Sequence, residues 1–210
     1  MKATISLTLN EAGYVVGQSH ATINRAVDRG VIKADLSPRG NARVRRVGQA
    51  ELRFLAIDAQ IGKDLTPAAR RKIYAAIQRA LPDAPRLELG MMDLKLMDVD
   101  RRIDERLKRL EQVKAFVDES LPNPELRDTG VPVHIVAALA RGQTIPEIAE
   151  DYPNLSTEQI GAAVEYAKIY PRAGRPLPSR SFKRMLSDLA EAGVWDLDNG
   201  APPAEPHLIP

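Results

Sequence analysis

The 210-residue sequence contains no cysteine and only three histidines. The absence of cysteine excludes a disulfide framework, a thiolate nucleophile and a zinc site with cysteine ligands. The longest mostly apolar run, Val131 to Ala140, is far shorter than the roughly 20 residues that span a bilayer. The N-terminus lacks the continuous apolar stretch of a signal peptide. We therefore expect a cytoplasmic protein without a membrane span, built as one large domain or two small ones.

The motifs of common enzyme classes are also missing. The sequence has no glycine-rich phosphate loop, no Gly-x-Ser-x-Gly elbow and no metal-ligand spacing among its histidines, His20, His134 and His207. One alternative is a phosphodiesterase whose metal is held by a local acidic cluster, formed by Asp93, Asp98, Asp100 and Asp104. Acidic residues at the start of a charged helix are more typical of a solvated face. We predict that the chain is not an enzyme and carries no metal or other cofactor.

Charge is distributed unevenly, although the net charge is only +2. Residues 1–86 contain 15 basic and 7 acidic residues, whereas residues 87–170 contain 10 basic and 16 acidic ones. This asymmetry indicates that the first part faces a polyanion such as DNA and that the second part does not. Compositional scatter is the alternative, because composition alone sets no geometry.

Helical periodicity and Pro/Gly punctuation predict a mostly α protein with three parts. The parts are a first domain (1–84), a helical second domain (85–170) and an extended C-terminal tail (171–210). Apolar spacing predicts a long helix over Val99 to Glu119, and Leu87-Glu88-Leu89 alternates like a strand. Three short helices are expected between Val131 and Ala167. In the proline-rich tail, only Ser181 to Ala192 has a helical pattern.

The N-terminal sequence predicts two short helices joined by a tight turn. Thr8-Leu9-Asn10-Glu11 is a capping box, Gly17-Gln18-Ser19 is a turn signal, and Ser19 is placed to cap a second helix that ends near Arg29-Gly30. The outer face of this second helix suits a major groove, where Arg25 can pair with guanine and Asn24 with adenine. The residues predicted to contact DNA on this helix are Ser19, His20, Thr22, Asn24 and Arg25.

A hairpin is expected next, because Val31 to Leu36 and Ala42 to Arg46 flank the turn residues Ser37 to Asn41. Its basic side chains are placed to contact the sugar-phosphate backbone or the minor groove: Arg39, Arg43, Arg45 and Arg46. Over about 45 residues, this helix pair and hairpin resemble the winged helix-turn-helix of MerR and excisionase-like DNA readers. The resemblance implies binding to double-stranded DNA. Docking to another protein is the alternative, because helix-turn-helix folds also serve that role.

A second resemblance covers about 45 residues of the second domain. Its motifs are the Gly142 that follows a helix, Asp151-Tyr152-Pro153-Asn154-Leu155 and the closing Tyr166-Ala167. They are similar to the small three-helix domain of VapB-like antitoxins, which pair with PIN-domain ribonuclease toxins. The chain departs from the family at Gly130-Val131, where the family has Thr-Arg. By their residue types, Tyr152, Tyr166 and His134 are expected to be structural residues rather than ligands.

The tail opens with Pro171-Arg172-Ala173-Gly174-Arg175-Pro176-Leu177-Pro178, which resembles the segment leading into the toxin-binding arm of these antitoxins. The resemblance implies that a tail arginine enters the carboxylate cluster of the toxin and displaces its metal. An apolar stripe beyond it suits a groove. The predicted toxin contacts are Arg175, Arg180, Phe182, Arg184, Leu186, Leu189 and Trp195. The alternative is a terminus that folds back on its own domain.

Together these features predict an antitoxin that represses its own operon through operator DNA and inhibits a PIN-domain ribonuclease through its tail. A homodimer is expected from palindromic operator geometry and from the apolar stripe over Val99 to Val117. A DNA-binding transcriptional regulator without a toxin partner is the alternative.

Overall fold

The computed structural model describes residues 5–39, 42–90 and 92–192 of the chain. The described residues are mostly helical and include three small antiparallel sheets. The predicted mostly α class is therefore confirmed. In the described part of the chain, none of the helices combines the length and the apolar character that crossing a membrane requires.

The first helix, α1, covers Leu9–Val16. Thr8 and Glu11 form the predicted capping box at its start, so two of its free backbone N–H groups have partners. Gly17 ends the helix with a φ of 70°, a left-handed conformation that favours glycine. This residue allows the chain to turn sharply into the next helix.

The second helix, α2, covers His20–Asp28, and Ser19 caps it as predicted by accepting a hydrogen bond from the Thr22 amide. Ile23 on its inner side is completely buried. Three strands follow the pairing order β1-β3-β2: β1 (Leu7–Thr8), β2 (Asp35–Arg39) and β3 (Ala42–Val47).

The hairpin is confirmed, but its turn is shorter than predicted. Ser37 pairs with Val44 and Pro38 pairs with Arg43, so both residues belong to β2 rather than to the turn. A proline fits this strand because β2 lies at the edge of its sheet, where one side of the backbone needs no partner.

Two further helices and a second hairpin complete this end of the molecule: α3 (Gln49–Ile61), a 3-10 turn (Gly62–Asp64), α4 (Pro67–Arg79), β4 (Leu87–Leu89) and β5 (Met92–Leu94). Thr66 caps α4, and Pro67 occupies its first turn, where a missing N–H costs nothing. The strand predicted from Leu87 is present, whereas its partner β5 was not predicted.

The long helix α5 covers Leu96–Ala115, so it begins three residues before the predicted start at Val99. It packs against α1, α3 and α8 (Thr157–Ile169) and so connects both ends of the molecule. Its stripe of Val99, Ile103, Leu110 and Val113 is buried inside the chain. That stripe therefore gives no support to a dimer, and the predicted homodimer rests on operator geometry alone.

After α5 the chain forms a three-stranded sheet and three short helices, and a fourth helix follows in the tail. Their bounds are β6 (Val117–Asp118), β7 (Glu125–Leu126), β8 (Val131–Pro132), α6 (Val133–Leu139), α7 (Ile145–Asp151), α8 and α9 (Phe182–Glu191). Sequence periodicity indicated these helices, but not the two-residue strands, which are too short for a period to be visible.

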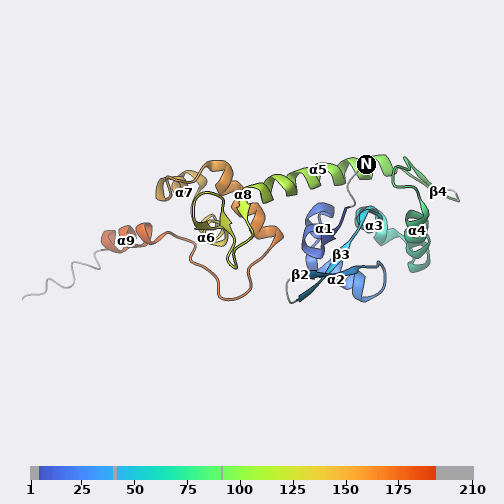
Figure 1. Ribbon diagram of the computed structural model, residues 1–210, viewed down its shortest axis with the longest axis horizontal. Helices are drawn as coiled ribbons and strands as arrows, with labels where there is room; N and C mark the ends of the chain where they lie inside the picture. Colours follow the sequence, from blue (N-terminus) through green and yellow to red (C-terminus); the bar gives the residue numbers. More distant parts are fainter. Residues whose placement is uncertain (1–4, 40–41, 91, 193–210) are drawn as a thin grey trace, which may run out of the picture.

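Figure 1 shows an elongated molecule in which α5 runs along one edge. Helices α1 to α4 lie at one end, α6 to α8 lie toward the other, and α9 projects beyond them. Helix α2, the β2–β3 hairpin and the loop between α8 and α9 lie along the edge opposite α5. The buried apolar residues form a core that extends from Leu9 to Ile169.

Candidate nucleic-acid interface and partner-binding helix

The outer face of α2 presents polar side chains to solvent. His20, Thr22 and Arg25 are exposed, and Asn24 is half-buried. Thr22 Oγ1 lies 2.9 Å from Ser19 Oγ at the helix start, and Arg25 Nε donates to the Ala21 carbonyl at 3.2 Å. A helix with buried Ile23 and this polar outer face can enter a major groove without exposing the core.

One network ties α2 to the hairpin. Arg45 Nη1 on β3 donates to Asp28 Oδ1 at 2.5 Å and to Asn24 Oδ1 at 2.9 Å, while Asn24 Nδ2 donates to Asp28 Oδ2 at 3.0 Å. Asn24 and Arg45, two predicted DNA contacts, are therefore partners of each other in this state. A base contact by Asn24 requires that this network rearrange, and Arg45 neutralises the only carboxylate on this face of α2.

The remaining arginines of the hairpin differ in their freedom. Arg43 is exposed, whereas Arg46 Nη1 donates to the Ser6 carbonyl at 2.8 Å and is half-buried. The Arg39 backbone pairs with Ala42 in the hairpin, but its side chain lies outside the described part of the structure. Of Arg43, Arg45 and Arg46, Arg43 is therefore the best placed to contact a phosphate.

A buried carboxylate joins the two ends of the molecule. Glu11 Oε2 accepts from the Thr8 amide, and Glu11 Oε1 accepts from Tyr170 Oη at 2.5 Å and from Lys114 Nζ at 3.0 Å. Burial alone would raise the pKa of Glu11, but these bonds, with Tyr170 the strongest, outweigh it and hold the pKa at about 2. The helix cap of α1 is thus also the attachment point of α5 and of the end of α8.

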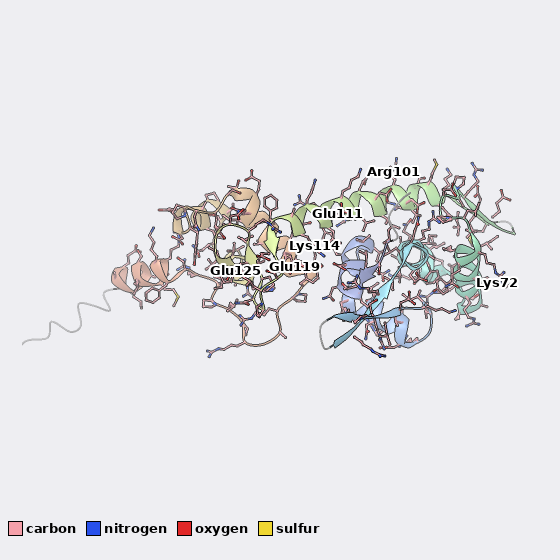
Figure 2. All side chains as sticks on the ribbon, in the orientation of Figure 1. Lys72, Arg101, Glu111, Lys114, Glu119 and Glu125 are labelled. Atoms are coloured by element: carbon pink, nitrogen blue, oxygen red, sulfur yellow. The ribbon has the colours of Figure 1, made fainter. Side chains whose placement is uncertain are left out.

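A second polar cluster lies beside the first. Glu165 on α8 accepts hydrogen bonds from Tyr14 Oη on α1 and from Arg109 Nε on α5, the latter at 2.8 Å. Burial raises the pKa of Tyr14, and the bond to Glu165 raises it further, so this tyrosine stays a donor. We call Glu11, Lys114 and Tyr170 together with Tyr14, Arg109 and Glu165 the junction. Figure 2 shows Lys114 near the middle of the molecule, between the two ends that α5 connects.

The acidic cluster near the start of α5 does not converge on one point. Asp93 pairs with Arg86, Asp98 pairs with Arg101, and Asp100 chelates the buried guanidinium of Arg53 with N–O distances of 2.6 and 2.7 Å. The sequence context of Asp100 indicated a solvated face. Its carboxylate is instead paired with the buried Arg53. Among the residues that the structure describes, no three His, Asp or Glu side chains gather as a metal site.

The tail returns to α7 through a second buried carboxylate. Asp151 Oδ2 accepts from Ser181 Oγ at 2.6 Å, from Gln143 Nε2 at 2.7 Å and from Arg184 Nε at 3.1 Å. Burial would raise the pKa of Asp151, but the bonds from Ser181, Gln143 and Arg184 lower it overall. We call Asp151, Gln143, Ser181 and Arg184 the latch. It fixes the N-terminus of α9 to the body.

The latch involves one residue that sequence analysis assigned to a toxin. Arg184 also reaches Glu150 Oε2 at 2.9 Å and Glu147 Oε1 at 3.4 Å. Arg180 pairs with Asp188 on α9 itself. Two of the predicted toxin-binding arginines are therefore paired within the chain, whereas Arg175 is exposed in the loop before the latch.

Beyond the latch, α9 has no buried residue. Its large apolar side chains remain exposed, with Phe182 at 74%, Met185 at 44%, Leu186 at 38% and Leu189 at 40% of their full accessible surface. The predicted contact Trp195 lies outside the described residues. A helix held at one end, with its apolar side chains uncovered, can present them to another molecule.

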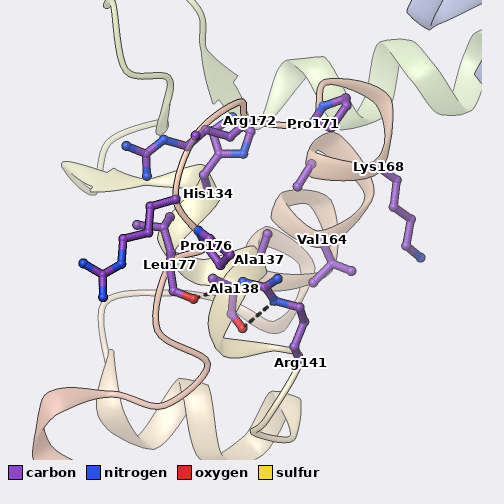
Figure 3. A pocket seen from close by; sticks show the side chains of 13 residues that line it. His134, Ala137, Ala138, Arg141, Val164, Lys168, Pro171, Arg172, Pro176 and Leu177 are labelled. Atoms are coloured by element: carbon purple, nitrogen blue, oxygen red, sulfur yellow. Dashed lines mark hydrogen bonds between the residues drawn. The ribbon is translucent and has the colours of Figure 1, made fainter. Parts of the chain in front are cut away.

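A cleft of about 460 Å³ lies between α6, α8 and residues 171–177. It is lined by small apolar side chains together with the basic residues Arg141, Lys168, Arg172 and Arg175. Figure 3 shows Lys168 extending from α8 on the side away from Arg172. Arg141 closes the cleft by donating to the Leu177 carbonyl at 3.1 Å.

Tyr166 lies between His134 and Tyr170 in a series of ring contacts. Tyr166 is buried and its ring lies 6.1 Å from that of His134 and 4.7 Å from that of Tyr170. Burial, and then the charge of Arg172, lower the pKa of His134, so its neutral form is favoured. These contacts agree with the structural role expected for Tyr166.

Sequence reasoning missed Arg53 and the second role of Glu11. Arg53 interrupts the apolar run Leu52-Arg53-Phe54-Leu55, and a charge inside such a run is a signal of a buried ion pair. Its partner Asp100 lies 47 residues further along the chain, and Tyr170 lies 159 residues from Glu11. No local spacing can identify partners at these separations.

One part of the chain is similar to a described protein family. Residues 123–167, which include β7, β8 and α6 to α8 up to Ala167, match the family described as "Protein of unknown function (DUF433)". Across most of its length the chain is also similar to the uncharacterized protein y4eO of Sinorhizobium fredii. That relative is 28% identical over 207 residues, which cover 90% of this chain and 89% of the relative.

Proposed function

We propose that this protein is a DNA-binding antitoxin that represses its own operon and inhibits a PIN-domain ribonuclease through its tail. In this proposal α1, α2 and the β2–β3 hairpin act as a winged helix-turn-helix on operator DNA. Helices α6 to α8 form the small three-helix domain of VapB-like antitoxins, and a dimer matches the symmetry of a palindromic operator.

The DNA-binding half is supported by the exposed polar face of α2 and by the hairpin next to it. Arg25 is exposed on α2 and Arg43 is exposed on β3. The first can donate two hydrogen bonds to guanine, and the second can contact a phosphate. Asp28 would repel DNA, but its ion pair with Arg45 offsets that charge.

The observation that carries the toxin-binding half is the uncovered apolar face of α9. Four large apolar side chains lie on a helix without a buried residue, and single chains rarely keep such a stripe exposed without a use for it. The match of residues 123–167 adds support, because that family consists of small proteins often associated with toxin–antitoxin systems.

One observation favours the alternative, a regulator without a toxin. Arg180 and Arg184 already have carboxylate partners in the chain. To enter an acidic active site, either arginine must first exchange these partners. Arg175, by contrast, is exposed in the loop before α9.

The test is co-purification of the full chain with a ribonuclease from its native host, combined with an assay of RNA cleavage by the recovered protein. The variant Leu186→Asp/Leu189→Asp places two charges on the apolar face of α9. A matched control, Met97→Asp/Leu121→Asp, places the same charges on apolar residues exposed elsewhere, at 67% and 43%.

The antitoxin predicts that only the α9 variant fails to recover and inhibit the ribonuclease, while both variants bind operator DNA. Equal recovery by both variants, or no ribonuclease with the unaltered chain, would support the plain regulator. For the DNA contact, Arg25→Ala should relax base preference, whereas Arg43→Ala should weaken binding to all sequences alike. Arg43 is a cleaner choice than Arg45, whose removal would also release Asp28.

A further inference from the structure

Three clefts follow one another from α2 to the tail loop. The first, of about 230 Å³, is lined by Gln18, Arg25 and other residues of α2, α3 and α4. The second, of about 490 Å³, shares Gln18 with the first and lies between α1, α5 and α8. The third is the cleft beneath residues 171–177, which shares Val164 and Lys168 with the second. Neighbouring clefts thus share lining residues, which places them next to one another.

The charges along this surface are strongly biased. The three linings contain two carboxylates, Asp58 and Glu165, and each is already paired with an arginine. We call the basic residues of these linings the basic track; they include Arg25, Arg106, Lys168, Arg172 and Arg175.

Arg172 and Arg175 at the end of the track are exposed, and among the described residues neither makes a hydrogen bond or an ion pair. Arg172 instead lies near enough to His134 to lower the pKa of that imidazole, so this cleft has an excess of positive charge. A polyanion is the ligand that such a row of cations attracts most strongly.

The track has a fixed geometry because the junction holds its two ends together. Tyr170 directly precedes the loop that carries Arg172 and Arg175, and its hydroxyl is bonded to Glu11 on α1. Glu165 joins α8 to α1 and α5 in the same region. Figure 1 shows the loop and α2 on the same edge of the molecule, opposite α5.

We infer that the DNA site extends beyond the winged helix-turn-helix along the basic track, with Arg172 and Arg175 contacting the phosphate backbone of the same duplex. This inference rests on the proposed DNA-binding function and assigns Arg175 to DNA rather than to a toxin. The second part of the chain has an excess of acidic residues, but Arg141 and Lys168 of this part line the cleft beside the tail loop. Phosphate contacts of this kind add affinity without reading sequence.

The test measures binding of the full chain to a labelled duplex of random sequence by fluorescence anisotropy, over a series of salt concentrations. The variant Arg172→Ala/Arg175→Ala removes two cations from the track. The control Arg101→Ala/Lys108→Ala removes two exposed cations from α5, and Figure 2 shows Arg101 on the opposite edge. Circular dichroism and urea unfolding check that both variants fold as the unaltered chain does.

The inference predicts that the track variant lowers the slope of log K against log salt by about two, because each lost phosphate contact removes about 0.9. The control should leave the slope unchanged. Equal slopes for the two variants would overturn the track, as would a track variant that binds DNA normally but no longer recovers a protein partner. If the unaltered chain binds no duplex, the proposed DNA function fails together with the track. If Arg43→Ala alone changes the slope, only the track fails.

Discussion

The junction and the latch are built around the same chemistry, a buried carboxylate that receives several hydrogen bonds. Glu11 accepts from Thr8, Tyr170 and Lys114, and its side chain is 7% exposed. Asp151 accepts from Ser181, Gln143 and Arg184, and its side chain is 2% exposed. In both places the carboxylate connects segments that are distant in the sequence.

The two regions differ in the apolar packing beneath the carboxylate. Helix α1 contributes Leu9, Ala12 and Val15 to the core, whereas α9 contributes no buried residue. Burial of one large apolar side chain stabilises a fold by about 1.5 to 3 kcal/mol, so the junction has support that the latch lacks. The junction is thus part of the core, whereas the latch is an attachment that can be released without exposing buried apolar residues.

The difference has a use in the proposed antitoxin. A partner that covers Phe182, Leu186 and Leu189 would need to displace only a few polar bonds to draw α9 away from α7. Separating α1 from α5 and α8 would require exposure of the core. The relative position of the DNA-binding end and the tail loop is therefore expected to persist when α9 moves.

Lowering the pH gives the largest expected effect on this comparison. The folded-state pKa of Glu11 is about 2, compared with 4.5 when unperturbed. A lowered folded pKa means that the stabilisation is present above pH 4.5 and is lost as the pH falls toward 2. For one group with this shift, the loss is about 3 kcal/mol. Urea unfolding at a series of pH values measures it.

Asp151 also has a lowered pKa, so acid should release α9 as well. Because α9 lacks buried apolar residues, its amides should lose protection from hydrogen exchange before the body of the protein unfolds. Simultaneous loss of protection in α9 and α1 would contradict the comparison.

The substitution Glu11→Gln should destabilise the protein by about 2 kcal/mol, because Lys114 and Tyr170 lose a charged acceptor. Glu147→Gln is the matched control, since Glu147 fills the same capping-box position on α7 and is more exposed. The control should change stability by less than about 0.5 kcal/mol. The midpoints of urea unfolding compare the two variants, and equal shifts would show that the junction adds nothing to the cap.

The substitution Gly142→Ala should have the smallest effect on global stability while releasing α9. A Cβ at this position would lie 2.6 Å from the Ser179 carbonyl oxygen, so the tail loop could not return to the body as it does here. Gly161→Ala is the control, because its Cβ meets open space on α8. Hydrogen exchange should show loss of protection in α9 for Gly142→Ala and not for Gly161→Ala. Retained protection in both would mean that the latch tolerates the displaced loop.

Local rules predicted much of the secondary structure. The capping box at Thr8, the cap at Ser19, the turn at Gly17 and the helix over Ser181 to Ala192 all depend on residues within a few positions of each other. Such signals can be recognised without knowing the fold. The exposed face of α2 was also predictable, because the period of a helix separates Ile23 from the polar residues.

The partners of the buried charges could not be predicted. The pairs Arg53–Asp100 and Glu11–Tyr170 join residues that no local pattern relates. The internal pairing of Arg184 has the same cause, since Asp151 lies 33 residues before it. Sequence identified these side chains as charged or polar, and their surroundings decide whether they are available for a ligand.

The sequence by itself determined where α1 and α2 begin and end, because caps and apolar periods act over one or two turns. It also determined that basic residues predominate in the first part of the chain. Only the tertiary structure decided which charges neutralise each other and which remain free. That choice depends on distances between helices, and these follow from packing of the whole core around α5. The apolar stripe of α5 illustrates the point, since packing buried it inside the chain and left the stripe of α9 exposed.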